Sequence, residues 1–570
     1  MKQSFTSSSK SLRRLSIRSR GKFHTSCKRL STFEYKWNVH KAKRTKRDIN
    51  YALAGGILFA ASYMFFTRNE LSLDSSRSLT TEGSKLITQQ RHLSGTATAT
   101  NSYNKSNQSQ LITDEQASRR LRAQEESYIL NNGRGVSRYD VCQVSSNNPI
   151  EDARAEKIIQ VPVEDSGSEN GKNDSYWYFW SVFDGHGGWN TSQKLSKEFT
   201  DAVIKELANS AYKVTHDDLH LVPSSETIDN AVKKGFVQFD HKMVIDNVQE
   251  FFGAEPKDKS AAIKLLLPAL SGSCALMSFY DTHTRNLKVA VSGDSRALLG
   301  SVNSKGVWTV KCLSIDQTGR NPSEVERLRR EHPGESNVVR NGRILGSLEP
   351  TRAMGDGKYK WGPELQQKLG DLFFGGKPLK KLKSAPYVTA EPVVTTQEIH
   401  PEKHDFLVLG SDGLYEMLSN EDIVALVVKW MEKKNMIKLK KPFLGSLFSN
   451  TDDTKLPKVI DISDSAAKAE KKPFRQFNRK NSKEYLLEDE NVATHLIRNA
   501  LSNGGYSEYV KLLLGISSPV SRRYRDDLTA TVVFFSDEDS AVQEGQNQAF
   551  VVVNPQATRG GLDQPLKSKL

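Results

Sequence analysis

Apolar runs separated by polar turns fill residues 137–535, and most of them have the length and composition of β-strands. "YWYFWSVF" (176–183) is almost continuously apolar, as expected of a strand that is buried on both faces. "CALMSFY" (274–280), "NLKVAVS" (286–292) and "RALLGSV" (296–302) predict successive antiparallel strands. Residues 189–209 and 225–251 carry apolar residues three or four positions apart, which predicts helices.

Capping residues mark two further helix starts. Asn321-Pro322-Ser323-Glu324 places a cap residue before a proline and a glutamate, and Ser419 precedes acidic residues in the same way. The order is then strands, a helix pair, strands, helices and a final strand. This order predicts an α+β fold, in which two mostly antiparallel sheets pack together and helices flank them.

Long polar stretches divide the chain of 570 residues and bring its apolar content down to 37%. We expect a leader (1–48), an apolar segment (49–66), a polar linker (67–125), a catalytic domain (126–536) and a polar tail (537–570). Within the domain, charged and proline-containing residues 433–485 interrupt the pattern and are expected to form an insertion.

The net charge of +14 is concentrated at the N-terminus. Residues 1–50 hold 15 Lys and Arg and 2 acidic residues, so they carry +13 of the total. The basicity therefore does not indicate a nucleic-acid-binding face, and no nucleic-acid partner is expected. Richness in Arg and Ser without acidic residues before Glu34 is typical of a mitochondrial transit peptide, which implies the mitochondrial import machinery as a partner. A basic tail without a targeting role is the alternative.

The apolar segment runs from Ile49 to Phe66 without a charged residue. Its length lies at the lower limit for crossing a bilayer, so we expect a transmembrane or sorting segment. A secretory signal would lie nearer the N-terminus, and a buried core helix is the remaining alternative. A stop-transfer segment after a presequence would leave the enzyme in the intermembrane space, whereas a segment that passes through would leave it in the matrix.

The last three residues, Ser568-Lys569-Leu570, match a peroxisomal address. The peroxisomal targeting receptor is therefore a candidate partner, and dual targeting to mitochondrion and peroxisome is a hypothesis. The 4 cysteines are widely scattered and predict neither a zinc site nor a disulfide framework.

Four short acidic motifs lie at the ends of predicted strands. They are Glu151-Asp152, Asp184-Gly185, Asp412-Gly413 and Asp526-Asp527. Carboxylates that converge need cations, because like charges at close range cannot all stay ionised. Oxygen ligands suit Mg²⁺ and Mn²⁺, so the motifs predict a metal-dependent hydrolase. The alternative for any one Asp-Gly pair is a tight turn.

Eight motifs occur in the order found in the metal-dependent, type 2C protein serine/threonine phosphatases, which the chain resembles over residues 137–535. They are "NPIED", "DGHGG", "SGSCA", "SGDSRALLG", "LSIDQ…NPSEVERLRREHP", "RILGSLEPTRAMGD", "GSDGLYE" and "RDDLTATVV". Within the family, "SNNPIED", "RAMGDGKYKWGPELQQKL" and "APYVTAEPVV" resemble the mitochondrial pyruvate dehydrogenase phosphatase branch, in its fungal, membrane-anchored form.

The resemblance implies an α-β-β-α sandwich and a site for two Mg²⁺ or Mn²⁺ ions. In that site Asp184 bridges the ions, and Gly185 offers its backbone carbonyl. Asp412 and Asp526 complete the first metal shell and Glu151 the second. His186 is the candidate general acid, because the pKa of a histidine lies near the working pH. Asp294 and Glu416 are candidates for a third, weaker metal.

Three positions depart from the family pattern. Asn147 stands where many members have an arginine that grips the substrate phosphate, so charged bidentate binding is lost. We expect weak activity on small esters and reliance on protein docking, with Arg138 or Arg154 as candidate substitutes. Glu416 replaces a usual Asp, and Gln317 replaces a usual His, for which only a modest effect is expected.

The leading hypothesis is a phosphatase for mitochondrial phosphoproteins, with pyruvate dehydrogenase E1α as the candidate substrate. The alternatives are an inactive phosphatase-like scaffold, and an active enzyme with intermembrane-space or peroxisomal substrates. Retention of Glu151, Asp184, Asp412 and Asp526 disfavours the scaffold.

Overall fold

A computed structural model describes residues 111–130, 135–163, 173–211, 223–253, 259–374, 378–379, 382–437, 455–464, 484–537 and 551–553. They all fall within one compact unit, Arg77–Leu570. The predicted leader, the apolar segment 49–66 and the terminal Ser-Lys-Leu lie outside the described residues. Among the described helices, none has both the length and the apolar character needed to cross a membrane.

Two sheets carry the fold within the described residues. The first has the order β14-β8-β7-β13-β15-β2-β1-β16, and the second β12-β6-β5-β4-β3, with β11 paired to β5. Neighbours are antiparallel except β14 and β8. The first sheet contains β1 (Glu126–Leu130), β2 (Gly135–Val144), β7 (Arg296–Val302), β8 (Trp308–Cys312), β13 (Phe406–Gly410), β14 (Ile460–Asp461), β15 (Leu528–Ser536) and β16 (Val551–Val553). The second contains β3 (Ala153–Val163), β4 (Asn173–His186), β5 (Gly272–Asp281), β6 (Asn286–Ser292), β11 (Met354–Gly355) and β12 (Val393–Glu398).

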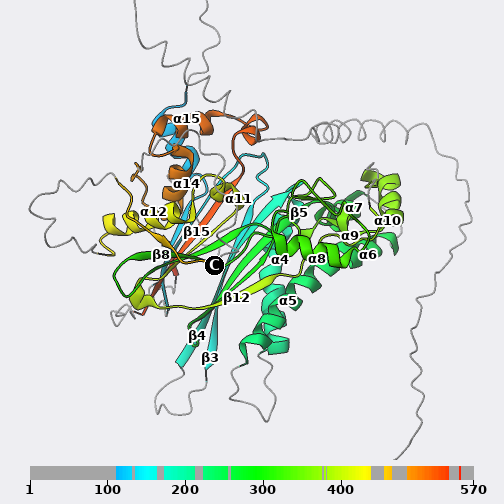
Figure 1. The fold of residues 1–570 in the computed structure, drawn as a ribbon, viewed down its shortest axis with the longest axis horizontal. Coiled ribbons are helices and arrows are strands. Elements are labelled where there is room, and N and C mark those ends of the chain that lie inside the picture. The colour runs from blue at the N-terminus through cyan, green and yellow to red at the C-terminus, as the bar shows by residue number, and fades with distance from the viewer. Residues whose placement is uncertain are drawn as a thin grey trace, which may run out of the picture. The chain divides into compact units, whose positions relative to one another are not determined.

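Helices flank the two sheets on opposite sides (Figure 1). The second sheet is covered by α4 (Asn190–Glu206), α5 (Ser225–His241), α6 (Asn247–Gly253) and α7 (Lys259–Leu270), with the π-helical turns η1 (Leu207–Ala211) and η2 (Lys242–Asp246). The first sheet is covered by α3 (Asp114–Arg122), α12 (Asn420–Lys433), α14 (Val492–Ser502) and α15 (Ser507–Gly515). The predicted α-β-β-α arrangement is confirmed.

The middle layer of the core lies between the sheets. The even-numbered residues Tyr178, Trp180 and Val182 of β4 pack there, while Phe179 and Phe183 face the helices. All five are almost fully buried. The prediction of a strand buried on both faces is therefore confirmed, and so are the helices predicted from residues 189 and 225.

A smaller group of elements lies beside the second sheet and forms its own apolar cluster. It includes α8 (Pro322–Glu331), the hairpin β9 (Val339–Arg340) and β10 (Arg343–Ile344), and α9 (Gly357–Lys360). The next helix, α10 (Pro363–Leu369), packs instead in the core between the second sheet and its helices, and the turn η3 (Gly370–Phe374) follows it. The remaining short helices are η4 (Pro401–Lys403), α11 (Asp412–Tyr415) and η6 (Val520–Arg523).

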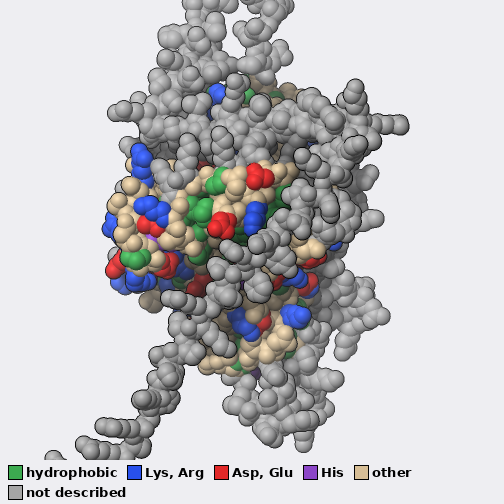
Figure 2. Space-filling model, turned by 90° about the vertical axis from the view of Figure 1, so that its right-hand side faces the viewer, with side chains coloured by type: hydrophobic (Ala, Val, Ile, Leu, Met, Phe, Trp, Pro, Cys, Tyr) green, Lys and Arg blue, Asp and Glu red, His purple; other side chains and the backbone are tan. Residues whose placement is uncertain are grey.

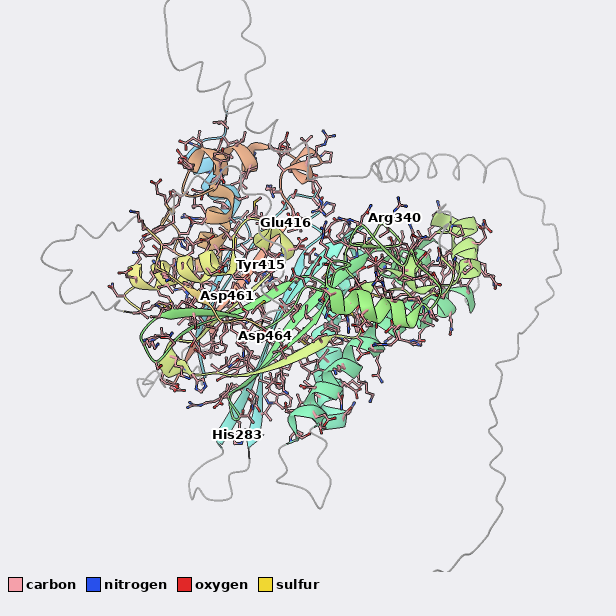
Figure 3. All side chains as sticks on the ribbon, viewed as in Figure 1. His283, Arg340, Tyr415, Glu416, Asp461 and Asp464 are labelled. Carbon is pink, nitrogen blue, oxygen red and sulfur yellow. The ribbon has the colours of Figure 1, made fainter. Side chains whose placement is uncertain are left out.

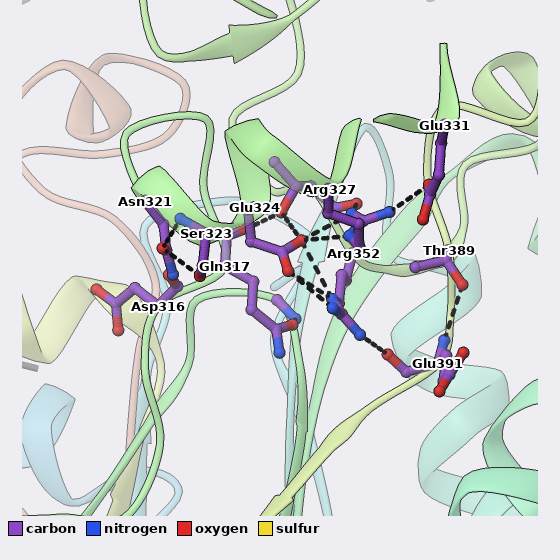
Figure 4. A network of polar contacts seen from close by, with 12 residues as sticks. Asp316, Gln317, Asn321, Ser323, Glu324, Arg327, Glu331, Arg352, Thr389 and Glu391 are labelled. Atoms are coloured by element: carbon purple, nitrogen blue, oxygen red, sulfur yellow. Dashed lines mark hydrogen bonds and ion pairs between the residues drawn. The ribbon is translucent and has the colours of Figure 1, made fainter. Parts of the chain in front are cut away.

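Buried Glu324 fastens α8 to the chain that follows it (Figure 4). Its carboxylate accepts hydrogen bonds from Thr351 Oγ1 at 2.7 Å and from Arg352 Nη2 at 2.8 Å. Burial raises the pKa of this carboxyl, but the bonds from Arg352 and Arg327 outweigh burial and lower the pKa to about 2. Glu324 therefore stays ionised at neutral pH, and the ion pairs hold α8 in place.

Two predicted boundaries differ from the structure. Residues 114–122, predicted as linker, form α3, whose N-terminus is closed by a capping box between Thr113 and Gln116. Within the predicted insertion, β14 pairs with β8 and Leu456 is buried. The polar composition of both segments gave no sign of these elements, because each contributes only one or two apolar side chains to the core.

On the face shown in Figure 2, acidic and basic side chains are interspersed over the described surface.

Replacement of Leu121 tests whether α3 belongs to the folded domain. Leu121 is 0% exposed and packs in the core under the first sheet. We expect Leu121→Ala to lower the free energy of unfolding by about 2–5 kcal/mol, measured by urea denaturation. Arg119→Ala is the control, because the side chain of Arg119 is 66% exposed. Equal stability of the two variants would contradict the packing of α3.

Candidate active site

The four acidic motifs meet where strands of both sheets end. Asp184 lies at the end of β4 and Asp412 begins α11 after β13, and the backbone N–H of Asp412 donates to Asp184 Oδ2 at 3.2 Å. Glu151 precedes β3 and Asp527 precedes β15, and the N–H of Glu151 donates to Asp527 Oδ2 at 2.8 Å. Motifs that are more than 370 residues apart therefore share one small volume.

Asp184 lies among other carboxylates. Burial raises the pKa of Asp184 well above its usual range, and the negative charges of Asp412 and Asp152 raise it further. Asp294 also contributes to this rise. Such a site favours either protons or metal cations, because each neutralises the charge that burial penalises.

Glu151 and Gly185 are in close contact across the site. The N–H of Gly188 donates to Glu151 Oε1 at 2.7 Å, which ties the glutamate to the turn after β4. A Cβ atom on Gly185 would collide with the backbone carbonyl of Glu151. Glycine is therefore required at this position for close backbone approach. That its carbonyl binds a metal stays a prediction.

Asp527 holds the loop that carries Glu151. Its carboxylate accepts hydrogen bonds from the N–H groups of Ser146 at 2.5 Å and Asn147 at 2.9 Å, besides that of Glu151. The side-chain amide of Asn147 donates to Asp527 at 3.1 Å and to Glu151 Oε2 at 3.0 Å. Asn147, which departs from the family pattern, thus links two acidic side chains.

Asp294 lies in the turn between β6 and β7. Its Oδ1 accepts a hydrogen bond from Cys274 Sγ at 3.0 Å. Burial and the charge of Asp412 raise the pKa of Asp294 to about 7. The amide of Gln317 fixes this turn, because its Oε1 accepts from the N–H of Gly293 at 2.8 Å. Gln317 is thus a positioning residue for Asp294.

Glu416 lies at the end of α11, near the middle of the described domain (Figure 3). Its N–H donates to the carbonyl oxygen of Asp412 at 2.8 Å, so the two acids are one helical turn apart. Glu416 is buried, with 8% of its surface exposed. Asp526, the remaining predicted ligand, forms an ion pair with Arg522.

His186 has an acidic partner that sequence reasoning missed. Its Nε2 lies 2.7 Å from Oδ2 of Asp356, which begins α9 with a left-handed backbone (φ 51°). Burial lowers the pKa of His186, but the charge and hydrogen bond of Asp356 outweigh burial and raise it. Gly272 is required here, because a Cβ atom would collide with both side chains of the pair.

The donors fit Mg²⁺ or Mn²⁺ in chemical type, since they are carboxylate and carbonyl oxygens. In the described part of the chain, no three His, Cys, Asp or Glu side chains are placed so that they already form a metal site. Water ligands would have to complete the shells, as is common for Mg²⁺.

Sequence reasoning assigned no role to Asp152, Asp527 or Asp356. Asp152 accepts a hydrogen bond from Thr529 Oγ1 at 2.7 Å, and burial together with Asp527 raises its pKa to about 8. The doubled acids in "IED" and "RDD" were the available signal for the first two. For Asp356 the signal was the "RAMGD" motif, which gives no indication of a histidine partner.

Comparison with known proteins shows the family of the chain. The family model described as protein phosphatase 2C matches residues 153–443. The chain belongs to the protein phosphatase 2C family. It is a protein serine/threonine phosphatase of the pyruvate dehydrogenase phosphatase-like branch, as two relatives indicate.

The mitochondrial pyruvate dehydrogenase (acetyl-transferring) phosphatase 1 of Saccharomyces cerevisiae is 44% identical over 531 residues, which cover 90% of this chain and 89% of that protein. The human mitochondrial pyruvate dehydrogenase phosphatase 2 is 30% identical over 71% of this chain and 78% of its own. Among solved structures, the serine-threonine phosphatase 2C of Toxoplasma gondii matches with a TM-score of 0.37 and 15% identity, covering 70% of this chain and 95% of that one.

Replacement of Asp356 by Asn tests the charge on His186. Because Asp356 raises the pKa of His186, the Asp356→Asn variant should titrate His186 at lower pH than the wild type. Asn tolerates the left-handed backbone, so the turn is kept. NMR titration, with the His186 signal assigned from a His186→Ala variant, measures the shift. An unchanged pKa would show that the pair is not formed in solution.

Proposed function

We propose that the chain removes phosphate from phosphoseryl and phosphothreonyl residues with the help of two Mg²⁺ or Mn²⁺ ions. One observation supports the proposal most strongly: strand ends from both sheets bring Asp184 and Asp412 into contact, with raised pKa at Asp184. A buried carboxylate of this kind needs a compensating cation to be ionised at neutral pH.

For the metal shells we propose the ligands that the family resemblance implies. Asp184 would bridge the ions, with Gly185 offering its carbonyl, Asp412 and Asp526 on the first ion and Glu151 on the second. Bound there, two divalent ions would supply a hydroxide nucleophile and shield the phosphoryl oxygens. A third, weaker site at Asp294 and Glu416 remains part of the proposal.

His186 would donate a proton to the leaving seryl or threonyl oxygen. Its raised pKa keeps more of the imidazole protonated near neutral pH, which suits a general acid. Asp356 accepts from one ring nitrogen and thereby fixes the ring. The proton would therefore leave from a histidine whose orientation is set by Asp356, at the start of α9.

Phosphorylated pyruvate dehydrogenase E1α is the substrate we propose, because the relatives reported above are named pyruvate dehydrogenase phosphatases. Their names also support a mitochondrial location. Anchoring through residues 49–66, and use of Ser568-Lys569-Leu570 by the peroxisomal receptor, are further proposals that rest on the sequence alone. An inactive scaffold would not need the retained carboxylates.

Replacement of Asp184 by Asn separates the enzyme from the scaffold. We expect Asp184→Asn to reduce Mn²⁺-dependent release of phosphate from phosphorylated E1α more than about 100-fold. Loss of a residue that only supports a metal ligand already lowers metal affinity or activity about 10- to 100-fold. Asp201→Asn, which removes an exposed acid from α4, should leave the rate unchanged. Activity that survives Asp184→Asn or EDTA treatment would refute the two-metal mechanism.

A further inference from the structure

The acidic site must also accept a doubly negative phosphate. A phosphoryl group approaches Asp184, Asp412, Glu151 and Asp526, so cationic side chains beside the metals would favour its binding. Arg138 and Arg154, the substitutes considered from sequence, are held by other acids. Arg138 lies 2.8 Å from Asp140.

Arg154 is held even more firmly. It lies 2.8 Å from Glu126 and 2.6 Å from Glu156, and only 7% of its side chain is exposed. Breaking these pairs would remove the cation that balances two buried carboxylates, which costs several kcal/mol. Neither arginine is therefore free to turn towards a substrate.

Arg522 is placed differently. It lies on η6, just before β15, and its Nη1 contacts Oδ1 of Asp526, a proposed metal ligand. Its positive charge also lowers the pKa of Glu151, although burial raises that pKa overall. Arg522 thus faces two acids that are proposed to hold different metals, and 39% of its side chain is exposed to solvent.

The loop that carries Asn147 is bonded to the segment that carries Arg522. Ser521 Oγ donates to the carbonyl oxygen of Ser146 at 2.6 Å, and Ser146 Oγ donates to that of Arg525 at 2.8 Å. These bonds hold η6 beside the position where the family's phosphate-binding arginine is missing. The amide of Asn147 is itself engaged with Glu151 and Asp527.

We propose that Arg522 is the phosphate-binding cation of this site, supplied from η6 in place of an arginine at position 147. Before metal binds, its guanidinium neutralises Asp526. When the oxygens of Asp526 are taken by a divalent ion, the guanidinium is released and pairs with the phosphoryl oxygens. The proposal rests on the proposed function, since it deepens the account of the same site.

Two affinities should respond in opposite directions to loss of this cation. Without Arg522, Mn²⁺ no longer competes with a guanidinium for Asp526, so its affinity should rise about 2- to 5-fold, the range of a partly exposed ion pair. The affinity of inorganic phosphate for the Mg²⁺-loaded protein should fall about 10- to 100-fold, the range of a hydrogen bond to a charged group. A merely structural residue would weaken both.

Calorimetry on the full-length chain tests this with three variants. Arg522→Gln removes the charge, and Arg522→Lys keeps it without the forked geometry, so it should lose phosphate affinity only in part. Arg523→Gln, an exposed neighbour on the same short helix, should change neither affinity. If Arg522→Gln does not fold, as judged by circular dichroism, Arg522→Lys carries the test.

An unchanged phosphate affinity in Arg522→Gln, a loss of Mn²⁺ affinity in that variant, or equal effects of Arg523→Gln would overturn the proposal. Because the titrations measure binding and not turnover, their result does not depend on whether the chain is an active phosphatase. If the wild-type chain binds Mn²⁺ and inorganic phosphate but releases no phosphate from phosphoproteins, only the proposed function is refuted. If the wild-type chain binds neither Mn²⁺ nor phosphate, both the proposed function and the proposed role of Arg522 are refuted.

Discussion

Repulsion between carboxylates that share one buried volume governs this molecule. Asp184, Asp152 and Asp294 are each held where burial and neighbouring acids raise the pKa. Such a cluster is unfavourable by itself, and it persists because backbone and side-chain donors hold its members in place. The repulsion that remains is what a divalent cation would remove, and it is the source of the metal affinity that we propose for the site.

The two-sheet architecture supplies the rigidity that this repulsion demands. β4 in one sheet delivers Asp184 and His186, while β13 and β15 in the other deliver Asp412 and Asp526. The layer of apolar side chains between the sheets fixes their separation, so the carboxylates cannot move apart. Helices on both outer faces complete the burial of the strands (Figure 1).

Local pattern in the sequence was sufficient for the strands, the helix caps at Asn321 and Ser419, and the acidic motifs at strand ends. It did not predict the pairs that join distant segments, such as His186 with Asp356 or Asn147 with Asp527. Periodicity records which face of an element is buried, but not which polar groups meet across the site. Composition also did not predict α3, since two buried side chains are enough to pack a short polar helix against the domain.

Proton release on metal binding tests the central claim most directly. If Mn²⁺ binds among carboxylates whose pKa values are raised, with Asp294 near 7 and Asp152 near 8, binding must displace protons. Calorimetric titration of Mn²⁺ in buffers of different ionisation enthalpy counts these protons. The account predicts net release near pH 6 that diminishes towards pH 9. Absence of Mn²⁺ binding, or binding with no proton release at pH 6, would contradict it.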